Sequence, residues 1–387
     1  MSRTARRFDA LGPGDVLELI RSGMATTRRD ILEITGLSRV TVASRIDALI
    51  TAGILREEGS EGSTGGRRPA VLAFNPSHRE LVCATVDTTH SVVARLDLDG
   101  TVLERTTLEI DVQAGPATVL EAVLDAAVDL VSRAASPLGG VGISLPAPID
   151  PHTSRPSQPP MLPGWDAFPV AETIRDRLDV PVVVENDADM LALGEHARRF
   201  PTLDALVLAK VDTGIGTGLI LGGRQYRGID GGAGDIGHVK VAEAAELVCQ
   251  CGASGCLAAI ASGRAVAAQL AALGHDTRSG HEVATLVRSG EVDAIRLTAE
   301  AGRRIGTVLA TVVNVINPGV VLVGGGLATT PLLAGIRETL YPRSLARSTR
   351  HLLVQLSELG SDAGLIGLAR EQVLRQYSPE ALNRALA

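Results

Sequence analysis

The chain has 387 residues, 45% of them hydrophobic and 21% charged, so it is long enough for roughly two to three folded domains and too apolar to be disordered. Aromatic residues make up only 2%, which excludes a stacking platform for single-stranded nucleic acid. The net charge of −7 is unevenly spread: residues 1–80 hold 12 Arg, no Lys and 10 acidic residues, which leaves 25 of the 37 basic and 34 of the 44 acidic residues for 81–387. This distribution predicts a slightly basic N-terminal module on an acidic body.

Cysteine content and apolar runs indicate the compartment. Four Cys are too few for a disulfide framework in a chain of this length, and no apolar segment follows the basic N-terminus as a secretory signal would require. The most apolar stretch, residues 305–328, is broken by Asn317, Pro318 and three successive glycines, which is typical of a buried helix, a turn and a parallel strand. We expect a cytoplasmic protein that does not associate with a membrane.

Three short helices are predicted near the N-terminus. Apolar spacing places them over 15–21, 28–35 and 38–52, and Thr27 and Ser38 are suitable caps for the second and third. A helix, a short turn containing Gly36 and a further helix form the helix-turn-helix pattern, in which the later helix enters the major groove of DNA. The candidate DNA contacts on the third helix are Ser38, Arg39, Thr41, Ser44 and Arg45.

The segment after the third helix is predicted to form a hairpin. A turn over 59–66, rich in glycine and serine, separates two strand-like segments, the second at 70–74. Arg67 and Arg68 in this hairpin are candidates for contact with phosphates or with a narrow minor groove, whose negative potential favours Arg. Residues 1–80 thus predict a winged helix-turn-helix domain. The alternative is an ordinary helical bundle with a solvated charged loop.

From about residue 81 the pattern changes to short apolar runs, helix-length segments and glycine turns. Strands of the buried type that alternate with helices predict an α/β fold for a body that spans 81–387. The expected strands are 81–86, 92–96, 101–108, 141–145, 180–184, 206–209, 218–221 and 320–323, and a helix is expected over 119–134.

Two motifs in this body suit the binding of a small molecule. Glu185-Asn186-Asp187 directly follows a buried strand, at the edge where an α/β sheet places its ligand. Asn both donates to and accepts from hydroxyl groups, and a neighbouring carboxylate can accept a hydroxyl proton, although a turn and helix cap explains the same residues. The glycines of 212–218 and beyond, up to His238, let backbone N–H groups approach a phosphate, although tight hairpins explain them equally well.

A possible metal site follows in the chain. His238, Cys249, Cys251 and Cys256 supply one imidazole and three thiolates, which complete a tetrahedral shell around Zn²⁺ with no open position, as in structural sites. A redox pair or unpaired buried thiols are the alternatives. Because Cys-x-Cys leaves too little room for a relaxed disulfide and the loop contains glycines, we expect a structural zinc ion at residues 238–256.

In combination, these motifs resemble the ROK family of repressors and sugar kinases. The resemblance covers nearly the whole chain. It rests on the glycine pattern of 211–238, the 185–187 element, the Cys-x-Cys-Gly-x-x-Gly-Cys loop, the stretch from Asn317 to Gly326, and the winged helix found on repressor members. The resemblance implies an actin-like, hexokinase-type ATPase fold of two α/β lobes.

The resemblance also implies roles for single residues. Asn186 matches the sugar-binding Asn of the family, and Asp187 matches the Asp that serves the kinases as base. His238 matches a zinc ligand that links the metal to the sugar pocket. Asp235 stands where the family usually has a sugar-binding Glu. The matching positions for the other zinc ligands are Cys249, Cys251 and Cys256.

Several positions depart from the pattern of the kinases. The first phosphate motif, residues 87–91, reads Asp-Thr-Thr-His-Ser and lacks both usual glycines, so side chains stand where backbone must approach phosphate. Asp212 replaces a usual Gly beside the expected polyphosphate, and Ala258 replaces a Glu and cannot bind a hydroxyl. Because loss of one well-placed donor costs about 10²–10³ in rate, these changes predict that the chain is not an enzyme and that Asp187 is a vestigial base.

The sequence thus predicts a sugar-responsive, DNA-binding transcriptional repressor. Its expected partners are double-stranded operator DNA and a sugar or sugar-phosphate effector, and it is expected to act as a homodimer or homotetramer. One alternative is an ATP-dependent sugar kinase with an accessory DNA-binding domain, since Asp187 and Thr213-Gly214 are retained. Another is a purely structural or interaction protein that has lost ligand binding, which Ala258 suggests.

Overall fold

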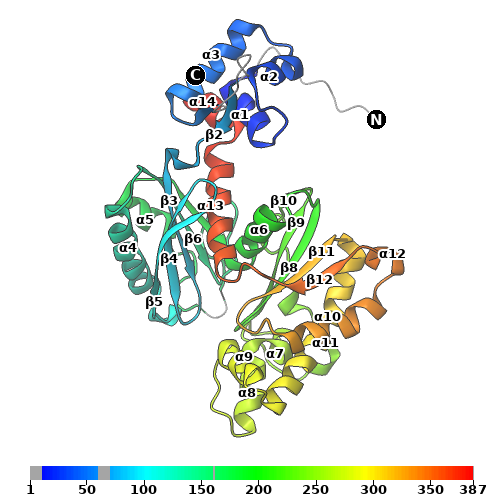
Figure 1. Ribbon diagram of the computed structural model, residues 1–387. Helices are drawn as coiled ribbons and strands as arrows, with labels where there is room; N and C mark the ends of the chain where they lie inside the picture. The colour runs from blue at the N-terminus through cyan, green and yellow to red at the C-terminus, as the bar shows by residue number, and fades with distance from the viewer. Residues whose placement is uncertain (1–10, 60–69, 160–161, 387) are drawn as a thin grey trace.

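The computed structural model describes residues 11–59, 70–159 and 162–386 and shows a small N-terminal domain joined to two α/β lobes (Figure 1). In the N-terminal domain, Thr27 and Ser38 cap their helices as predicted, because their side-chain oxygens accept hydrogen bonds from Asp30 N and Thr41 N. The three predicted helices are confirmed, and β1 and β2 pair antiparallel as the two strands of the predicted hairpin, whose turn lies outside the described residues. Arg67 and Arg68 lie outside the described residues. The elements are α1 (Pro13–Arg21), α2 (Arg28–Thr35), α3 (Arg39–Thr51), β1 (Leu55–Glu58) and β2 (Val71–Phe74).

The first lobe is a sheet in the order β5-β4-β3-β6-β7. Strands β3, β6 and β7 run parallel to one another. Strand β4 pairs antiparallel with β3, and β5 pairs antiparallel with β4 at the edge of the sheet. Helices α4 and α5 cover one face through an apolar cluster that includes the buried Trp165. The elements are β3 (Glu80–Val86), β4 (Ser91–Asp97), β5 (Val102–Leu108), α4 (Pro116–Ser132), β6 (Leu138–Leu145), α5 (Val170–Leu178) and β7 (Val182–Asn186).

The second lobe repeats this arrangement in the order β10-β9-β8-β11-β12, with β8, β11 and β12 parallel. The repetition confirms the expected two-lobed α/β fold. The apolar stretch 305–328 includes the end of α10 and the inner strand β11, and among the residues that the structure describes no helix is long and apolar enough to cross a membrane. The elements are β8 (Ala205–Val211), β9 (Ile215–Leu221), β10 (Arg224–Gln225), α7 (Ala258–Ala261), α8 (Gly263–Ala272), α9 (Gly280–Arg288), α10 (Val292–Ile316), β11 (Val320–Gly324), α11 (Thr330–Arg343), α12 (Ala346–Thr349) and β12 (Leu353–Leu356).

Helices α6 (Asp187–Arg199) and α13 (Asp362–Gln376) lie between the two sheets (Figure 1). They approach backbone to backbone: a Cβ at Gly194 would lie 1.8 Å from the carbonyl oxygen of Ala363, and one at Gly367 would lie 2.0 Å from that of Met190. Since α6 begins where β7 ends and α13 runs to the N-terminal domain, this close contact connects the centre of the body with that domain.

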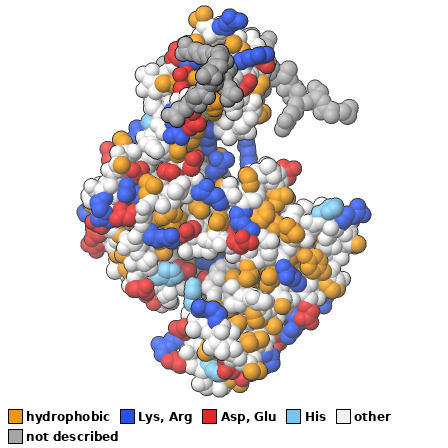
Figure 2. All heavy atoms as spheres, in the orientation of Figure 1, with side chains coloured by type: hydrophobic (Ala, Val, Ile, Leu, Met, Phe, Trp, Pro, Cys, Tyr) orange, Lys and Arg blue, Asp and Glu red, His pale blue; other side chains and the backbone are white. Residues whose placement is uncertain are grey.

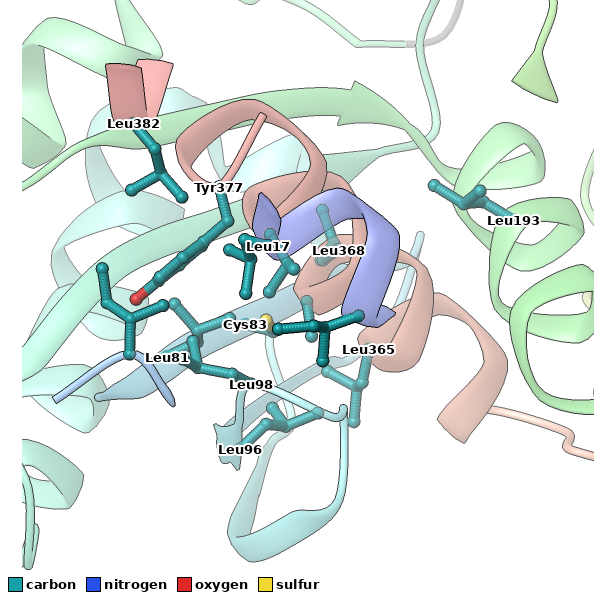
Figure 3. Packing of buried hydrophobic residues seen from close by; sticks show 14 of the residues in the cluster. Leu17, Leu81, Cys83, Leu96, Leu98, Leu193, Leu365, Leu368, Tyr377 and Leu382 are labelled. Atoms are coloured by element: carbon teal, nitrogen blue, oxygen red, sulfur yellow. The ribbon is translucent and has the colours of Figure 1, made fainter. Parts of the chain in front are cut away.

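The C-terminal helix α14 (Pro379–Ala385) packs on α1 at the other end of the chain. Asn383 joins the two, because its Oδ1 accepts from Gly14 N and its Nδ2 donates to Asp15 Oδ2, both at 2.8 Å. Figure 3 shows Leu17 of α1 in one apolar core with Tyr377 and Leu382 and with side chains from α13 and the first sheet. The N-terminal domain is therefore packed onto the first lobe and α13, and the domain boundary at residue 80 stays a prediction.

Candidate functional site

The residues that were predicted to bind a small molecule line one cavity of about 160 Å³. Asn186 and Asp187 reach it from the end of β7 and the first turn of α6, whereas Asp235 and His238 reach it from the loop after β10. Ala258 lies in the same wall and offers no polar side-chain atom. The fold thus brings together polar groups from both lobes that can hydrogen-bond hydroxyl groups.

Asn186 is held in a fixed orientation by the backbone. Its Oδ1 accepts from Asp189 N at 3.1 Å, and its Nδ2 donates to the carbonyl oxygen of Ala147 at 3.0 Å. The helix-cap interpretation is therefore correct for this residue. One Nδ2 hydrogen and one lone pair of Oδ1 are left over for a ligand, so the cap and a binding role are compatible.

A buried lysine holds Asp187. Lys210 of β8 places its Nζ 2.5 Å from Asp187 Oδ2 and 3.9 Å from Asp87 Oδ1. Burial raises the pKa of Asp187 in spite of the ammonium group beside it. Burial opposes the charge of Lys210, but Asp187 and Asp87 outweigh this effect and raise the lysine's pKa. Sequence reasoning missed Lys210, although the scarcity of lysine could have drawn attention to it: the chain has only two lysines among 37 Lys and Arg residues.

Asp212 accepts hydrogen bonds from the glycine-rich loops. Its Oδ2 accepts from Gly326 N at 2.8 Å, and its Oδ1 accepts from its neighbour Thr213 N at 2.9 Å. The Thr213 hydroxyl lies 3.1 Å from that of Thr88, which belongs to the first lobe. Backbone N–H groups of the kind that bind phosphate are therefore paired with a carboxylate of the chain itself.

A second cavity of about 480 Å³ adjoins the first, and Asp87, Asp187, Lys210 and Asp212 line both. The second is also lined by His90 and His281, whose ring centroids are 5.9 Å apart, and by Gly324–Gly326. With three carboxylates and one ammonium among these shared residues, this cleft repels a polyphosphate unless cations accompany it.

The predicted metal ligands also come together. One ligand atom from each of His238, Cys249, Cys251 and Cys256 lies within 4.8 Å of the others. The Sγ atoms of Cys251 and Cys256 are 3.7 Å apart, and Cys249 Sγ lies 3.8 Å from His238 Nδ1. Ligand atoms about 2.0–2.3 Å from a tetrahedral Zn²⁺ have spacings of about 3.3–3.8 Å, so the donor set and its geometry fit a metal ion. The cysteines are free of disulfides.

The surroundings of this cluster suit thiolates. Lys240, the second of the two lysines, places its Nζ 3.1 Å from Cys256 Sγ and donates to the carbonyl oxygen of Ser254 at 2.6 Å. His238 lines the cavity and turns its Nδ1 toward Cys249. When Nδ1 binds a metal, the other ring nitrogen is left for a second partner, as is usual for metal-bound histidines.

The candidate DNA contacts lie on and before the first turns of α3. Ser38, Arg39 and Ser44 are exposed, whereas Thr41 and Arg45 are half-buried. Ser38 Oγ lies 2.8 Å from Thr41 Oγ1, so the two hydroxyls are already partly engaged with each other. Val40 was missed as a candidate and is 79% exposed on the same turn. Over the lobes, the visible face in Figure 2 shows acidic and basic side chains interspersed, without a broad basic surface.

Comparison with known proteins adds independent evidence. Residues 82–371 match the sequence model of the ROK family. The chain is 25% identical over 372 residues to the putative xylose repressor of Caldicellulosiruptor sp. (strain Rt8B.4), an alignment that covers 91% of this chain and 92% of that protein. It is 27% identical over 312 residues to the glucokinase of Halalkalibacterium halodurans, which covers 75% of this chain and 94% of the kinase.

A solved structure has the same fold over nearly the whole chain. The crystal structure of a ROK family transcriptional regulator, a homologue of the E. coli MLC protein, superposes with a TM-score of 0.80 at 23% sequence identity. The superposition covers 97% of both chains, so it includes the N-terminal domain as well as the lobes.

Proposed function

The chain belongs to the ROK family, and we propose that it is a sugar-responsive transcriptional repressor that binds double-stranded operator DNA. One observation carries the proposal: α13 packs against α6, the helix that begins at the cavity, and leads into the winged helix-turn-helix domain. A DNA-binding unit and a cavity for a hydroxylated ligand are therefore parts of one packed structure. The relatedness to a repressor over 91% of the chain, against 75% for a kinase, supports the same conclusion.

DNA recognition is assigned to α3 and the wing. The start of α3 would enter the major groove, where Ser38, Arg39, Thr41, Ser44 and Arg45 meet base edges and phosphates. Arg67 and Arg68 of the wing would bind phosphates or the minor groove. Two copies of the chain would place two α3 helices on half-sites about 34 Å apart, which is why we propose a homodimer, or a homotetramer built from it.

The effector is a sugar or sugar phosphate bound in the first cavity. Asn186 and His238 would donate to its hydroxyls, and Asp187 and Asp235 would accept from them. Loss of surrounding water raises the pKa of Asp235. Because these residues come from both lobes, a bound sugar draws the lobes together, and the movement changes the placement of the two DNA-binding domains.

We propose that the cleft no longer transfers phosphate. Lys210 forms an ion pair with Asp187, the candidate base, and Asp212 takes up the backbone donors of Gly326 and Thr213. Phosphoryl transfer depends on positioning and on stabilising charge on the phosphates, and each of these two contacts occupies groups that such a transfer would use.

The Cys and His cluster is proposed to hold a structural Zn²⁺. Three thiolates and one imidazole leave no open coordination position, so the ion would fix the loop of 238–256 rather than act on a substrate. His238 belongs both to this ligand set and to the cavity wall. Such thiolates stay reduced in a cytoplasm, where we place the protein.

The test uses the full-length chain. Genomic fragments, including the chain's own promoter, are selected for binding at moderate salt, and the selected operator is titrated with and without D-xylose, D-glucose and N-acetyl-D-glucosamine. A sugar that shifts the thermal midpoint of the wild type but not of Asn186→Ala, and that changes operator affinity, is expected. Absence of any retained fragment would overturn the repressor assignment.

The kinase alternative is tested on the same sugars. The presence of Asp187 in the cavity and the relatedness to a glucokinase favour it. ADP release is measured with ATP and each sugar, against Asp187→Ala as the control. Turnover above the control would support a kinase, and equal background rates are expected.

A further inference from the structure

A closed ring of charged side chains lies behind the sugar cavity. Arg227 donates from Nε and Nη2 to the two carboxylate oxygens of Glu185 at 3.0 and 2.9 Å, and its Nη2 also lies 2.9 Å from Glu371 Oε1. Arg375 closes the ring, because its Nε donates to Glu371 Oε1 at 2.8 Å and its Nη2 donates to Glu185. Glu185 and Glu371 are buried, with 3% and 7% exposure.

The members of the ring come from three parts of the site. Glu185 is the residue before Asn186 on β7, so it is fixed to one wall of the cavity. Arg227 lies at the start of the loop that carries Asp235 and His238, which line the cavity from the second lobe. Glu371 and Arg375 lie on α13. The ring therefore joins both walls of the cavity to the helix that leads to the DNA-binding domain.

The C-terminal end of α13, which carries Glu371 and Arg375, is attached to that domain. The ring of Tyr377, the residue after α13, packs edge to face on Phe74 of the wing strand β2, with centroids 5.5 Å apart. Figure 3 shows Tyr377 in one core with Leu17 of α1. A displacement of α13 is therefore also a displacement of α1 and β2.

We propose that Arg227 is a positioning residue that couples the position of the sugar-binding loop to the position of α13. A buried carboxylate without a partner is strongly unfavourable, so Glu185 and Glu371 keep Arg227 in contact with them. When a sugar moves the loop of 227–238, the ring either carries α13 along or exchanges its partners, and both changes reach the DNA-binding domain. This inference rests on the proposed sugar-responsive repressor.

The experiment compares two arginine substitutions in the full-length chain. Arg227→Met removes the member of the ring that comes from the second lobe. Arg105→Met is the matched control, because Arg105 also pairs with α13, through Asp362 at 2.7 Å, but does so from the first lobe. Glu371→Gln removes one charge of the ring with little change of shape. It is measured in place of Arg227→Met if that variant does not fold. Arg227→Lys tests whether charge alone restores the contact.

The first readout is amide hydrogen exchange without sugar or DNA. Exchange of residues 371–376 and of α1 is expected to rise at least about tenfold in Arg227→Met and to stay within about twofold in Arg105→Met, with the sheets unchanged in both. Equal exchange in the two variants would overturn the proposal, and so would a rise throughout the chain, which indicates general destabilisation.

The second readout is the effect of D-xylose, D-glucose and N-acetyl-D-glucosamine on operator affinity. The sugar that shifts wild-type affinity, by about 5- to 150-fold for a typical coupling, is expected to shift that of Arg227→Met less than threefold while its own Kd stays nearly constant. Retained coupling in Arg227→Met would overturn the proposal. If no DNA or sugar binds the wild type, the proposed function fails, whereas the exchange comparison still decides whether Arg227 positions α13.

Discussion

Asp189 gives the fold a specific dependence on pH. Its side chain is 7% exposed on α6, and its Oδ1 has no hydrogen-bond partner among the described residues. Burial, and then the charge of Glu185, raise its pKa from an ordinary 3.8 to about 7. The native chain therefore holds a proton between about pH 4 and pH 7 that the unfolded chain has released. Stability must consequently fall as the pH rises through this window, by up to about 4 kcal/mol in total.

The substitution Asp189→Asn removes this titration and keeps a donor and an acceptor in place. Urea unfolding of the wild type and the variant is compared at pH 5, 6, 7 and 8. The free energy of unfolding of the variant, relative to the wild type, is expected to rise from pH 5 to pH 7 and then to level off. Asp276→Asn, whose side chain is 91% exposed, is the control and is expected to show no such rise. A difference between Asp189→Asn and wild type that is independent of pH would refute the reasoning.

Three further predictions concern the other sites. Asp212→Gly frees Gly326 N and Thr213 N and removes a carboxylate, so ATP affinity measured by calorimetry is expected to rise at least about tenfold. An unchanged affinity would contradict the inference that the Asp212 carboxylate occupies the place of a phosphate. Cys251→Ser is expected to lower bound zinc from about one ion per chain and to lower the Tm, and a variant with full zinc content contradicts the assigned ligands. Arg39→Ala is expected to weaken operator binding by about 1–3 kcal/mol. The control is Arg278→Ala on the second lobe, whose side chain is 85% exposed and whose loss is expected to leave operator binding unchanged. Equal losses in the two variants would contradict the assignment of α3 as the DNA-binding helix.

Local signals made much of the fold predictable. Side-chain caps and apolar periodicity depend on residues only a few positions apart. The sequence therefore predicted the caps Thr27 and Ser38, and the buried face of α3 formed by Val42, Ile46 and Leu49. The grouping of the candidate metal ligands was predictable for the same reason, since Cys249, Cys251 and Cys256 share one short loop.

Contacts between distant segments were not predictable in this way. The hydrogen bond between Gly14 N and Asn383 joins residues 369 positions apart, and no periodicity reports it. Strand β12 has only four residues and lies at the edge of its sheet, so its apolar pattern is short. The ring around Arg227 also depends on residues from three separate segments. For Lys210 a signal did exist in the scarcity of lysine, but its meaning required the position of Asp187.

The charges around the cleft are consistent with the proposed role of a sugar sensor that binds no nucleotide. In a kinase of this architecture, the carboxylates and glycine loops of the cleft need an external polyphosphate and its cations to balance them. Here Lys210 supplies a cation to Asp187 and Asp87, and Asp212 supplies an anion to Gly326 N. Both are tethered to β8 or its end and are present whether or not a ligand is bound. Under the proposed function, closing of the lobes would then depend on the sugar and not on a nucleotide, as a sugar-responsive repressor requires.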